Sequence, residues 1–339
     1  MFKVLADAHI PYLEYYLPKQ HFDLHLYHNV SELTALIHDQ DILICRSIYQ
    51  INQAILANSQ IKLVATATSG INHVDIDYLQ AQGITLVHAK GGNAAAVVDY
   101  VCASLASLEK HQQFKARKIA ILGYGHVGQA LAARLTILGY DIGIYDPLLP
   151  KHIIRPYPSI ECVDLHHFDT ISIHANYHTD VPYPSRHLID ARLKQQFSSQ
   201  SCLINAARGH IVDESFIFSP AFQGIYCADV FEHEPQPNAA ILKRASLATP
   251  HIAGHSIESK LRMSEIISYH IHQHLQLTAL PKSLSKNAST PIDSTLWQQE
   301  ILSHYDPYAE TLALRQEAGT NFLKLRHAHH RHEFQWLPR

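Results

Sequence analysis

Three polar side chains follow apolar runs in the second half of the sequence: Arg208 in INAARG, Glu234 in ADVFEHEP and His251 in TPHIAG. Such runs are typical of buried parallel strands, whose carboxyl ends line the ligand crevice of an open α/β sheet. Arg208 could bind a carboxylate through paired hydrogen bonds and polarise the oxygen on the neighbouring carbon. His251 could take a hydroxyl proton as hydride leaves, while Glu234 orients the imidazole. The set predicts hydride transfer at a 2-hydroxy acid.

Each of these residues also has a structural interpretation. An arginine after a strand often forms a surface ion pair, a lone histidine is commonly structural, and Glu234-Pro235 could be part of a loop. Their order behind a nucleotide-binding motif favours the catalytic interpretation.

That motif is GYGHVG at residues 123–128, which fits GxGxxG between the apolar run KIAIL and the helical pattern HVGQALAARL. Its first glycine permits a tight turn, the second lets a pyrophosphate approach the backbone, and the third allows close packing of helix on strand. The free N–H groups at the helix start suit phosphates. Asp146 lies 21 residues after the middle glycine, where a carboxylate binds the adenine ribose and repels a 2′-phosphate. We therefore expect NAD as the cofactor. The structural alternative is a tight turn with a helix-breaking Asp146-Pro147 and no bound nucleotide.

Elements that could position these side chains alternate along the chain. Short apolar runs separated by helical patterns predict parallel sheets covered by helices. The predicted strands are 3–6, 42–45, 63–67, 84–87, 119–122, 141–145, 170–174, 201–205 and 224–230. The predicted helices are 31–38, 52–57, 75–82, 93–110, 126–138 and about 256–277.

This order predicts two α/β domains joined by two long helices, the second of which returns the chain to the first domain. We expect a discontinuous substrate domain at 1–92 and 254–281 and an NAD-binding domain at 93–253. Composition shifts at Pro281, and residues 282–294 (KSLSKNASTPIDS) are typical of a linker. The remaining tail is too short for a core of its own. We therefore expect a linker and dimerisation module at 282–339; a tail packed on its own chain is the alternative.

Composition excludes several functional classes. The chain has 339 residues, with 27 Lys and Arg against 30 Asp and Glu, and lacks an apolar run long enough to span a bilayer. We therefore expect no nucleic-acid or membrane partner. Asp7 stands where a signal peptide would be apolar, so we expect a cytoplasmic protein.

Cysteine and histidine usage bears on metal binding. The five cysteines have no CxxC spacing, which favours buried free thiols over a disulfide framework or a zinc site. Of the 27 histidines, seven lie in the two stretches 270–274 and 327–332, but no accompanying ligand pattern completes a tetrahedral site. We expect no metal.

The motifs GYGHVG…YD, INAARGHIVDE, ADVFEHEP and TPHIAGHS resemble those of the NAD-dependent D-2-hydroxyacid dehydrogenases. Residues 46–52, 64–75, 90–101, 251–260 and 318–334 are also similar to the erythronate-4-phosphate dehydrogenase family, so the resemblance covers nearly the whole chain. It implies two Rossmann-like or flavodoxin-like doubly wound parallel-sheet domains with the active site between them. It also implies a small C-terminal dimerisation module and hence a homodimer.

The resemblance further implies NAD-dependent oxidation of 4-phospho-D-erythronate, a small phosphorylated 2-hydroxy acid, to (R)-3-hydroxy-2-oxo-4-phosphooxybutanoate in pyridoxal 5′-phosphate biosynthesis. Two alternatives stay open, because fold alone does not separate them. One is another D-2-hydroxyacid dehydrogenase, acting on phosphoglycerate or glycerate. The other is a non-catalytic NAD-sensing interaction protein on the same scaffold.

The resemblance also assigns residues. It places Arg208, Glu234 and His251 at the catalytic positions. The implied cofactor contacts are Gly123, Gly125, His126, Val127, Gly128, Asp146, Ala175, Ala206, Ala207, Asp229 and Gly254. The implied substrate contacts are Arg46, Ser47, Thr68, Gly92 and His255. For Ser47 and Thr68, a strand-end cap or turn is the structural alternative.

The chain departs from the family pattern at several positions. His255 stands where a substrate-contacting Tyr is expected, Ala175 replaces a Thr near the cofactor, and Asp99 replaces a Glu. Pro220 falls inside an expected helix after Asp213, which it would break or kink. The tail is also shorter than the usual module. These departures bear on substrate affinity and dimer geometry more than on the type of reaction.

Overall fold

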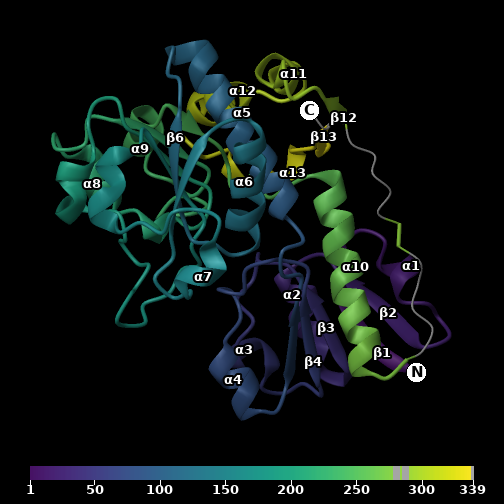
Figure 1. Ribbon diagram of the computed structural model, residues 1–339. Helices are drawn as coiled ribbons and strands as arrows, with labels where there is room; N and C mark the ends of the chain where they lie inside the picture. The colour runs from purple at the N-terminus through teal and green to yellow at the C-terminus, as the bar shows by residue number, and fades with distance from the viewer. Residues whose placement is uncertain (278–282, 285–289, 337–339) are drawn as a thin grey trace. The chain divides into compact units, whose positions relative to one another are not determined.

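The computed structural model describes residues 1–277, 283–284 and 290–336 (Figure 1). These residues form two compact units. The first unit holds residues 1–93 with 257–277 and 283–284, and the second holds 94–256 with 290–336. Each is built on a parallel sheet with flanking helices, which confirms the predicted α/β fold with two doubly wound sheets.

The first unit is built on a five-stranded parallel sheet in the order β2-β1-β3-β4-β5. Its strands are β1 (Phe2–Asp7), β2 (Phe22–Tyr27), β3 (Ile42–Cys45), β4 (Leu63–Thr66) and β5 (Thr85–His88). The strand order reverses between β1 and β3, the kind of switch point at which doubly wound sheets bind ligands. Asp7 ends β1 and Arg46 follows β3, so both lie at this switch point.

Successive strand residues point to opposite faces of this sheet, and both faces are apolar. Helices therefore pack on both faces. On β1, Val4 and Ala6 pack with Ile267 and Ile271 of α10 (Ile257–His274), while Leu5 packs into the opposite core. Figure 1 shows α10 running along this sheet. The other helices are α1 (Leu13–Tyr16), α2 (Val30–Leu36), η1 (Ile37–Asp39), α3 (Gln53–Leu56) and α4 (Ile76–Ala81).

The sequence analysis missed β2, which pairs with β1 over six residues from Phe22 to Tyr27. As an edge strand, β2 leaves part of its length exposed, including His25. Polar residues such as Asp23 and His25 are common on edge strands and hide the apolar run that marks a central one.

The second unit is built on a six-stranded parallel sheet in the order β11-β10-β9-β8-β6-β7. Its strands are β6 (Lys118–Leu122), β7 (Asp141–Tyr145), β8 (Thr170–Ile173), β9 (Cys202–Asn205), β10 (Ile225–Ala228) and β11 (Leu247–Ala248). The sequence analysis missed β11, which is two residues long and carries no periodicity. The order reverses between β6 and β8, which places the switch point beside the glycine loop.

Helices again cover both faces of this sheet. On one face lie α5 (Ala94–Gln112) and α6 (His126–Ile137), and on the other α8 (Glu214–Phe218) and α9 (Ala239–Arg244). The short elements are α7 (Lys151–Ile154), η2 (Cys162–His167), η3 (Ala191–Gln196) and η4 (Gly209–Ile211). Because α8 ends at Phe218, Pro220 follows the helix and does not kink it.

Residues 290–336 share the core of the second unit. They form β12 (Thr290–Ile292), α11 (Trp297–His304), α12 (Pro307–Gln316), α13 (Phe322–Ala328) and β13 (Phe334–Trp336). Strands β12 and β13 pair in parallel, and α11 packs on α5 through Trp297 and Ile301. Of the predicted linker, residues 282 and 285–289 lie outside the described residues, and residues 290–292 form a strand instead. Dimerisation through this tail stays a prediction.

Buried polar groups anchor the end of the tail. Asp99 on α5 accepts hydrogen bonds from the backbone N–H of Phe334 at 2.9 Å and from the indole N–H of Trp336 at 3.0 Å. Burial raises the pKa of Asp99 to about 6, although the charge of Arg331 opposes the effect. Arg331 donates to the carbonyl of Ala253 at 2.7 Å. Asp99 thus ties the tail to α5, a role that the sequence analysis did not foresee.

Most of the cysteines are buried, as the sequence analysis predicted. All five cysteines are free; Cys45, Cys102, Cys202 and Cys227 are buried, and Cys162 is half-buried. Among the residues that the structure describes, no helix combines the length and apolar character needed to cross a membrane.

His174, which directly follows β8, gives a testable pH dependence. Burial lowers the pKa of its imidazole to about 3, and its Nε2 hydrogen-bonds Ser172 Oγ at 2.8 Å. Because the unfolded chain takes up this proton below about pH 6.5 and the folded chain does not, the stabilisation is complete above that pH and falls on acidification. Between about pH 7.5 and 5, the free energy of unfolding should fall by about 1–2 kcal/mol less in His174→Gln than in the native protein. Urea denaturation at both pH values measures this; identical pH slopes for the two proteins would contradict it.

Candidate active site

The glycine loop after β6 leaves room for a ligand at one position only. Gly123 has φ +96°, and a Cβ there would lie 2.5 Å from the backbone nitrogen of Ala175. A Cβ on Gly128 would lie 2.0 Å from the carbonyl oxygen of Gly123. A Cβ on Gly125, by contrast, meets nothing within 4 Å, and Gly125 and His126 are exposed where α6 begins. This open helix N-terminus fits a pyrophosphate group.

Asp146 lies beside this loop, directly after β7. Its carboxylate accepts hydrogen bonds from the backbone N–H of Tyr124 at 2.8 Å and of Leu148 at 3.2 Å. Since β7 pairs with β6, the carboxylate is held next to the glycine turn. A carboxylate at this place suits the two hydroxyls of a ribose, so the residues present fit an adenine dinucleotide without a 2′-phosphate. Val127 is half-buried in the first turn of α6.

Gly125→Ala tests the loop separately from the fold. We expect this variant to keep the stability of the native protein, because the added Cβ meets open space, but to bind NAD about tenfold or more weakly because the methyl group keeps the pyrophosphate from the backbone. Gly128→Ala is the matched variant, and it should lower the melting temperature because of its contact with Gly123. Calorimetric NAD titration and thermal unfolding measure both effects. Unchanged NAD affinity in Gly125→Ala would place the pyrophosphate elsewhere.

Glu234 and His251 form a close pair. His251 adopts a left-handed backbone conformation with φ +55°, and its backbone N–H donates to the carbonyl of Asp229 at 2.8 Å. Its Nδ1 lies 2.6 Å from Oε2 of Glu234. Burial would raise the pKa of Glu234, but the charge and hydrogen bond of His251 and the N–H of Phe231 outweigh it and lower that pKa. An ionised Glu234 accepts the Nδ1–H, which leaves Nε2 of a neutral imidazole free to take a proton.

Asp229 fixes the loop that carries His251. This fully buried carboxylate accepts hydrogen bonds from Thr249 Oγ1 at 2.7 Å and from the backbone N–H groups of Ile252 at 2.8 Å and Ala253 at 2.9 Å. Burial raises its pKa, although His251 and these donors oppose the effect. The sequence analysis assigned Asp229 to the cofactor; the structure additionally makes it the anchor of the 249–253 turn.

Arg208 directly follows the Asn205-Ala206-Ala207 segment at the end of β9. Asn205 Nδ2 donates to the carbonyl of Arg208 at 3.0 Å, and Arg208 Nη1 donates to the carbonyl of Ala207 at 2.7 Å. Burial lowers the pKa of the guanidinium while Glu234 opposes the effect; arginine stays charged at neutral pH. Ala206 is half-buried and Ala207 buried beside it. Arg208, Glu234 and His251 thus bring a cation, a carboxylate and an imidazole together within one unit.

The remaining assigned residues of this unit flank the same strand ends. Ala175 abuts Gly123 across the switch point between β6 and β8. Gly254 and His255 follow the 249–253 turn and are half-buried, and the His255 N–H donates to the carbonyl of Ile252 at 2.8 Å.

In the first unit, Arg46 lies at the switch point of the sheet. Its Nε donates to Asp7 Oδ2 at 2.9 Å, and the side chain of Asp7 is only 4% exposed. Ser47 beside it is exposed. A half-buried guanidinium held by a buried carboxylate is positioned to meet an anion with its remaining N–H groups.

Thr68 and Gly92 have internal contacts in the first unit. Thr68 Oγ1 donates to the carbonyl of Gly70 at 2.7 Å and lies 2.8 Å from Thr66 Oγ1, which matches the turn that the sequence analysis kept as its alternative. A Cβ on Gly92 would lie 2.7 Å from the side chain of Met263, so a glycine lets α10 pack here.

Two cations near the assigned residues were missed by the sequence analysis. Burial, followed by the nearby charge of Arg46, lowers the pKa of Lys260 on α10. Arg326 on α13 is close enough to lower the pKa values of both Arg208 and Glu234. Lys260 lies in the stretch 251–260, whose resemblance to the family was the only sequence signal for it. Nothing in the sequence pattern around Arg326 indicated that it lies near Arg208 and Glu234.

Comparison with known proteins is consistent with this geometry. Residues 100–253 match the D-isomer specific 2-hydroxyacid dehydrogenase, NAD binding domain. The chain is 39% identical to an erythronate-4-phosphate dehydrogenase of Legionella pneumophila subsp. pneumophila (strain Philadelphia 1) over 335 residues, 98% of this chain and 95% of that protein. An erythronate-4-phosphate dehydrogenase of Psychromonas ingrahamii is 34% identical over 281 residues, 81% of this chain and 73% of that protein.

Solved structures share the fold. The NAD⁺-bound 3-phosphoglycerate dehydrogenase of Entamoeba histolytica has a TM-score of 0.70 at 19% identity, covering 84% of this chain and 99% of that one. The NAD-dependent formate dehydrogenase of Staphylococcus aureus, in complex with NAD, has a TM-score of 0.67 at 20% identity, covering 83% and 98%. The extent of the sequence match decides the assignment: the chain belongs to the erythronate-4-phosphate dehydrogenase family of the NAD-dependent D-2-hydroxyacid dehydrogenases.

Proposed function

We propose that this protein oxidises 4-phospho-D-erythronate to (R)-3-hydroxy-2-oxo-4-phosphooxybutanoate in the biosynthesis of pyridoxal 5′-phosphate, with NAD as cofactor. The observation that carries the proposal is the 2.6 Å bond between Glu234 and His251, with the Arg208 guanidinium close by. The names of the relatives supply the substrate. This triad favours chemistry over an NAD-sensing role, which needs no proton acceptor.

The side chains of the second unit divide the work of the reaction. Arg208 binds the substrate carboxylate and polarises the C2 oxygen. Nε2 of His251 takes the C2 hydroxyl proton, and the ionised Glu234 stabilises the resulting imidazolium. When bound at the glycine loop and Asp146, NAD supplies the hydride acceptor.

The phosphate group distinguishes the proposed substrate from glycerate. We assign it to the two cations of the first unit, Arg46 and Lys260, with Ser47 as an additional donor. Burial and the charge of Arg46 lower the pKa of Lys260, which supports a shared position of these two cations, and a dianionic phosphate would relieve the repulsion between them.

Arg46→Ala tests this assignment. We expect KM for 4-phospho-D-erythronate to rise about 10–100-fold, as for the loss of a charged hydrogen-bond pair, while kinetics on unphosphorylated D-erythronate change little. Because Arg46→Ala also leaves Asp7 without its partner, Lys260→Ala serves as a second variant that leaves this ion pair intact and should show the same selectivity. The control is Lys62→Ala, which removes an exposed cation directly before β4, at the amino ends of the strands. Arg46 lies at their carboxyl ends. Equal losses on both substrates would remove these cations from the phosphate site.

Two further parts of the proposal concern the state of the protein. We propose a cytoplasmic homodimer that pairs through residues 290–336. Apolar side chains of this segment remain accessible to a second copy of the chain: Trp336 is half-buried, and Leu312 and Leu323 are exposed. Sedimentation velocity of the full chain should give the mass of a dimer, and Leu312→Glu with Leu323→Glu should shift it to a monomer. A monomeric native protein would overturn this part alone.

A further inference from the structure

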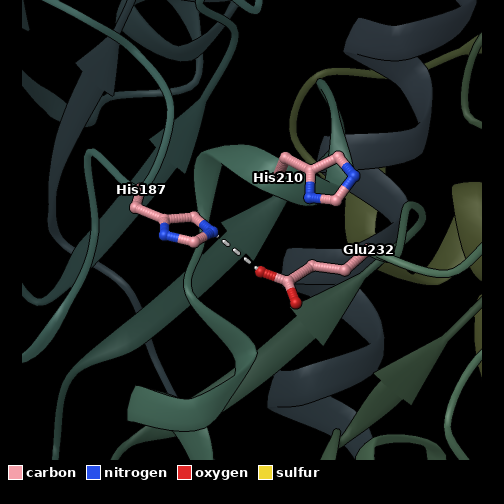
Figure 2. A group of neighbouring side chains, drawn as sticks. All are labelled: His187, His210 and Glu232. Carbon is pink, nitrogen blue, oxygen red and sulfur yellow. Dashed lines mark hydrogen bonds and ion pairs between the residues drawn. The ribbon is translucent and has the colours of Figure 1, made fainter. Parts of the chain in front are cut away.

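Two histidines and a glutamate from three separate segments converge in the second unit, as Figure 2 shows. His187 lies in the loop before η3, His210 lies in η4, and Glu232 follows β10. One potential ligand atom from each residue lies within 4.8 Å of the other two. Nε2 of His187 is 3.0 Å from Oε1 of Glu232.

The backbone holds the two histidines together. The N–H of His187 donates to the carbonyl of His210 at 2.9 Å, and the N–H of Ile189 donates to the carbonyl of Ile211 at 3.1 Å. His187 has φ +50°, an uncommon conformation for a residue other than glycine. Its position is therefore set by its hydrogen bonds to the neighbouring segment.

The glutamate is held against the same segment. A Cβ on Gly209 would lie 2.0 Å from the carbonyl oxygen of Phe231, so the two backbones are in direct contact only because residue 209 has no side chain. The N–H of Glu232 donates to Glu214 Oε1 at 3.1 Å. The three side chains are thus brought together by the fold, with their potential ligand atoms within 4.8 Å of one another.

The residue types match those of an open zinc site. Two imidazoles and one carboxylate, with water in the fourth position, are a known set for tetrahedral Zn²⁺. At zinc–ligand distances of about 2.0–2.1 Å the ligand atoms of a tetrahedral site lie about 3.4 Å apart. The atoms of His187 and Glu232 are 3.0 Å apart, and all three ligand atoms lie within 4.8 Å of one another. The side chains of His187 and Glu232 are 33% and 16% exposed and His210 is exposed, so an ion and its water can enter. Mg²⁺ and Ca²⁺ prefer all-oxygen sites.

We propose that His187, His210 and Glu232 bind Zn²⁺ or a similar divalent transition-metal ion. The sequence analysis expected no metal, and its two histidine-rich stretches contain none of these residues. The ion has no part in hydride transfer. It joins the segment two residues after Arg208 to the segment two residues before Glu234, so its effect is to stabilise the second unit around these side chains. This inference does not depend on the substrate proposed above.

Metal titration of the untagged, chelator-treated full chain tests the site. With Co²⁺ as the probe, the native protein should bind one equivalent tightly and show the strong visible absorption of four-coordinate cobalt, which Zn²⁺ should then displace. His210→Ala should weaken this binding by more than about tenfold. Glu232→Gln, which keeps the shape of the side chain but not its charge, should do the same. The proposal would be overturned if the native protein bound no tight equivalent of Co²⁺, or if both variants bound Co²⁺ as tightly as the native protein.

A matched control addresses the many other histidines. His270 and His274, one helical turn apart on α10, form another possible metal-binding pair, and the double variant His270→Ala/His274→Ala should keep the tight equivalent. Thermal unfolding gives a second readout, because an ion that binds the folded state raises the melting temperature. Zn²⁺ should raise it for the native protein and the double variant but not for His210→Ala, whose metal-free melting temperature should match the native one. A Zn²⁺ response lost in the double variant instead would place the ion on α10.

Discussion

Replacing His251 by Gln is expected to lower kcat by about 10²–10⁴-fold while leaving NAD affinity nearly unchanged. The imidazole is the proton acceptor of the proposed mechanism, and its Nδ1–H is committed to Glu234, which leaves Nε2 for the substrate. Glutamine keeps a polar side chain but accepts no proton. Steady-state NADH formation and calorimetric NAD titration on the same preparations measure the two effects.

The control for this substitution is His152→Gln, an exposed histidine on α7 of the same unit. It should leave both kcat and NAD affinity at native values. A His251→Gln protein that retained native kcat would exclude His251 as the proton acceptor, whereas loss of NAD binding along with kcat would indicate a damaged 249–253 turn.

Arg208→Gln should lower kcat/KM by about 10²–10³-fold, which corresponds to about 3–4 kcal/mol of lost transition-state stabilisation. In the proposed mechanism the half-buried guanidinium holds the substrate carboxylate and polarises the C2 oxygen, and a neutral amide does neither. The kcat/KM of Arg208→Lys should lie between those of the native protein and Arg208→Gln, because lysine keeps the charge without the paired N–H donors. Initial rates across substrate concentrations give kcat/KM for each protein.

Arg186→Gln provides the matched comparison, since Arg186 is an exposed arginine of the same unit. We expect native kinetics from it. If Arg208→Gln kept native kcat/KM, the carboxylate would be bound by a different group. If Arg208→Lys matched the native enzyme, the charge at residue 208 would suffice and the paired N–H donors would not be needed.

The local patterns predicted the parts of the site that lie close together in sequence. The glycine loop and Asp146 belong to one strand–helix–strand segment, so their spacing alone carried the prediction of an NAD site. Arg208, Glu234 and His251 each follow an apolar run, and parallel strands bring such positions to one edge of a sheet. The central strands could be predicted because their residues are apolar on both faces.

The parts that the sequence did not reveal depend on long-range packing. Strand β12 lies within an apparent linker and forms by pairing with β13, more than forty residues later in the chain. The approach of Arg326 to Arg208 and the clustering of His187, His210 and Glu232 likewise need the folded second unit. Edge strand β2 was hidden because exposed polar residues interrupt its apolar pattern.

The most direct test of the proposed function is NADH formation from 4-phospho-D-erythronate, measured beside 3-phosphoglycerate and D-glycerate with a 2-oxo acid present to reoxidise any tightly bound NADH. The account predicts the highest kcat/KM for 4-phospho-D-erythronate and formation of its 2-oxo acid. A higher kcat/KM for either of the other acids, or NAD binding without turnover of any of them, would contradict it.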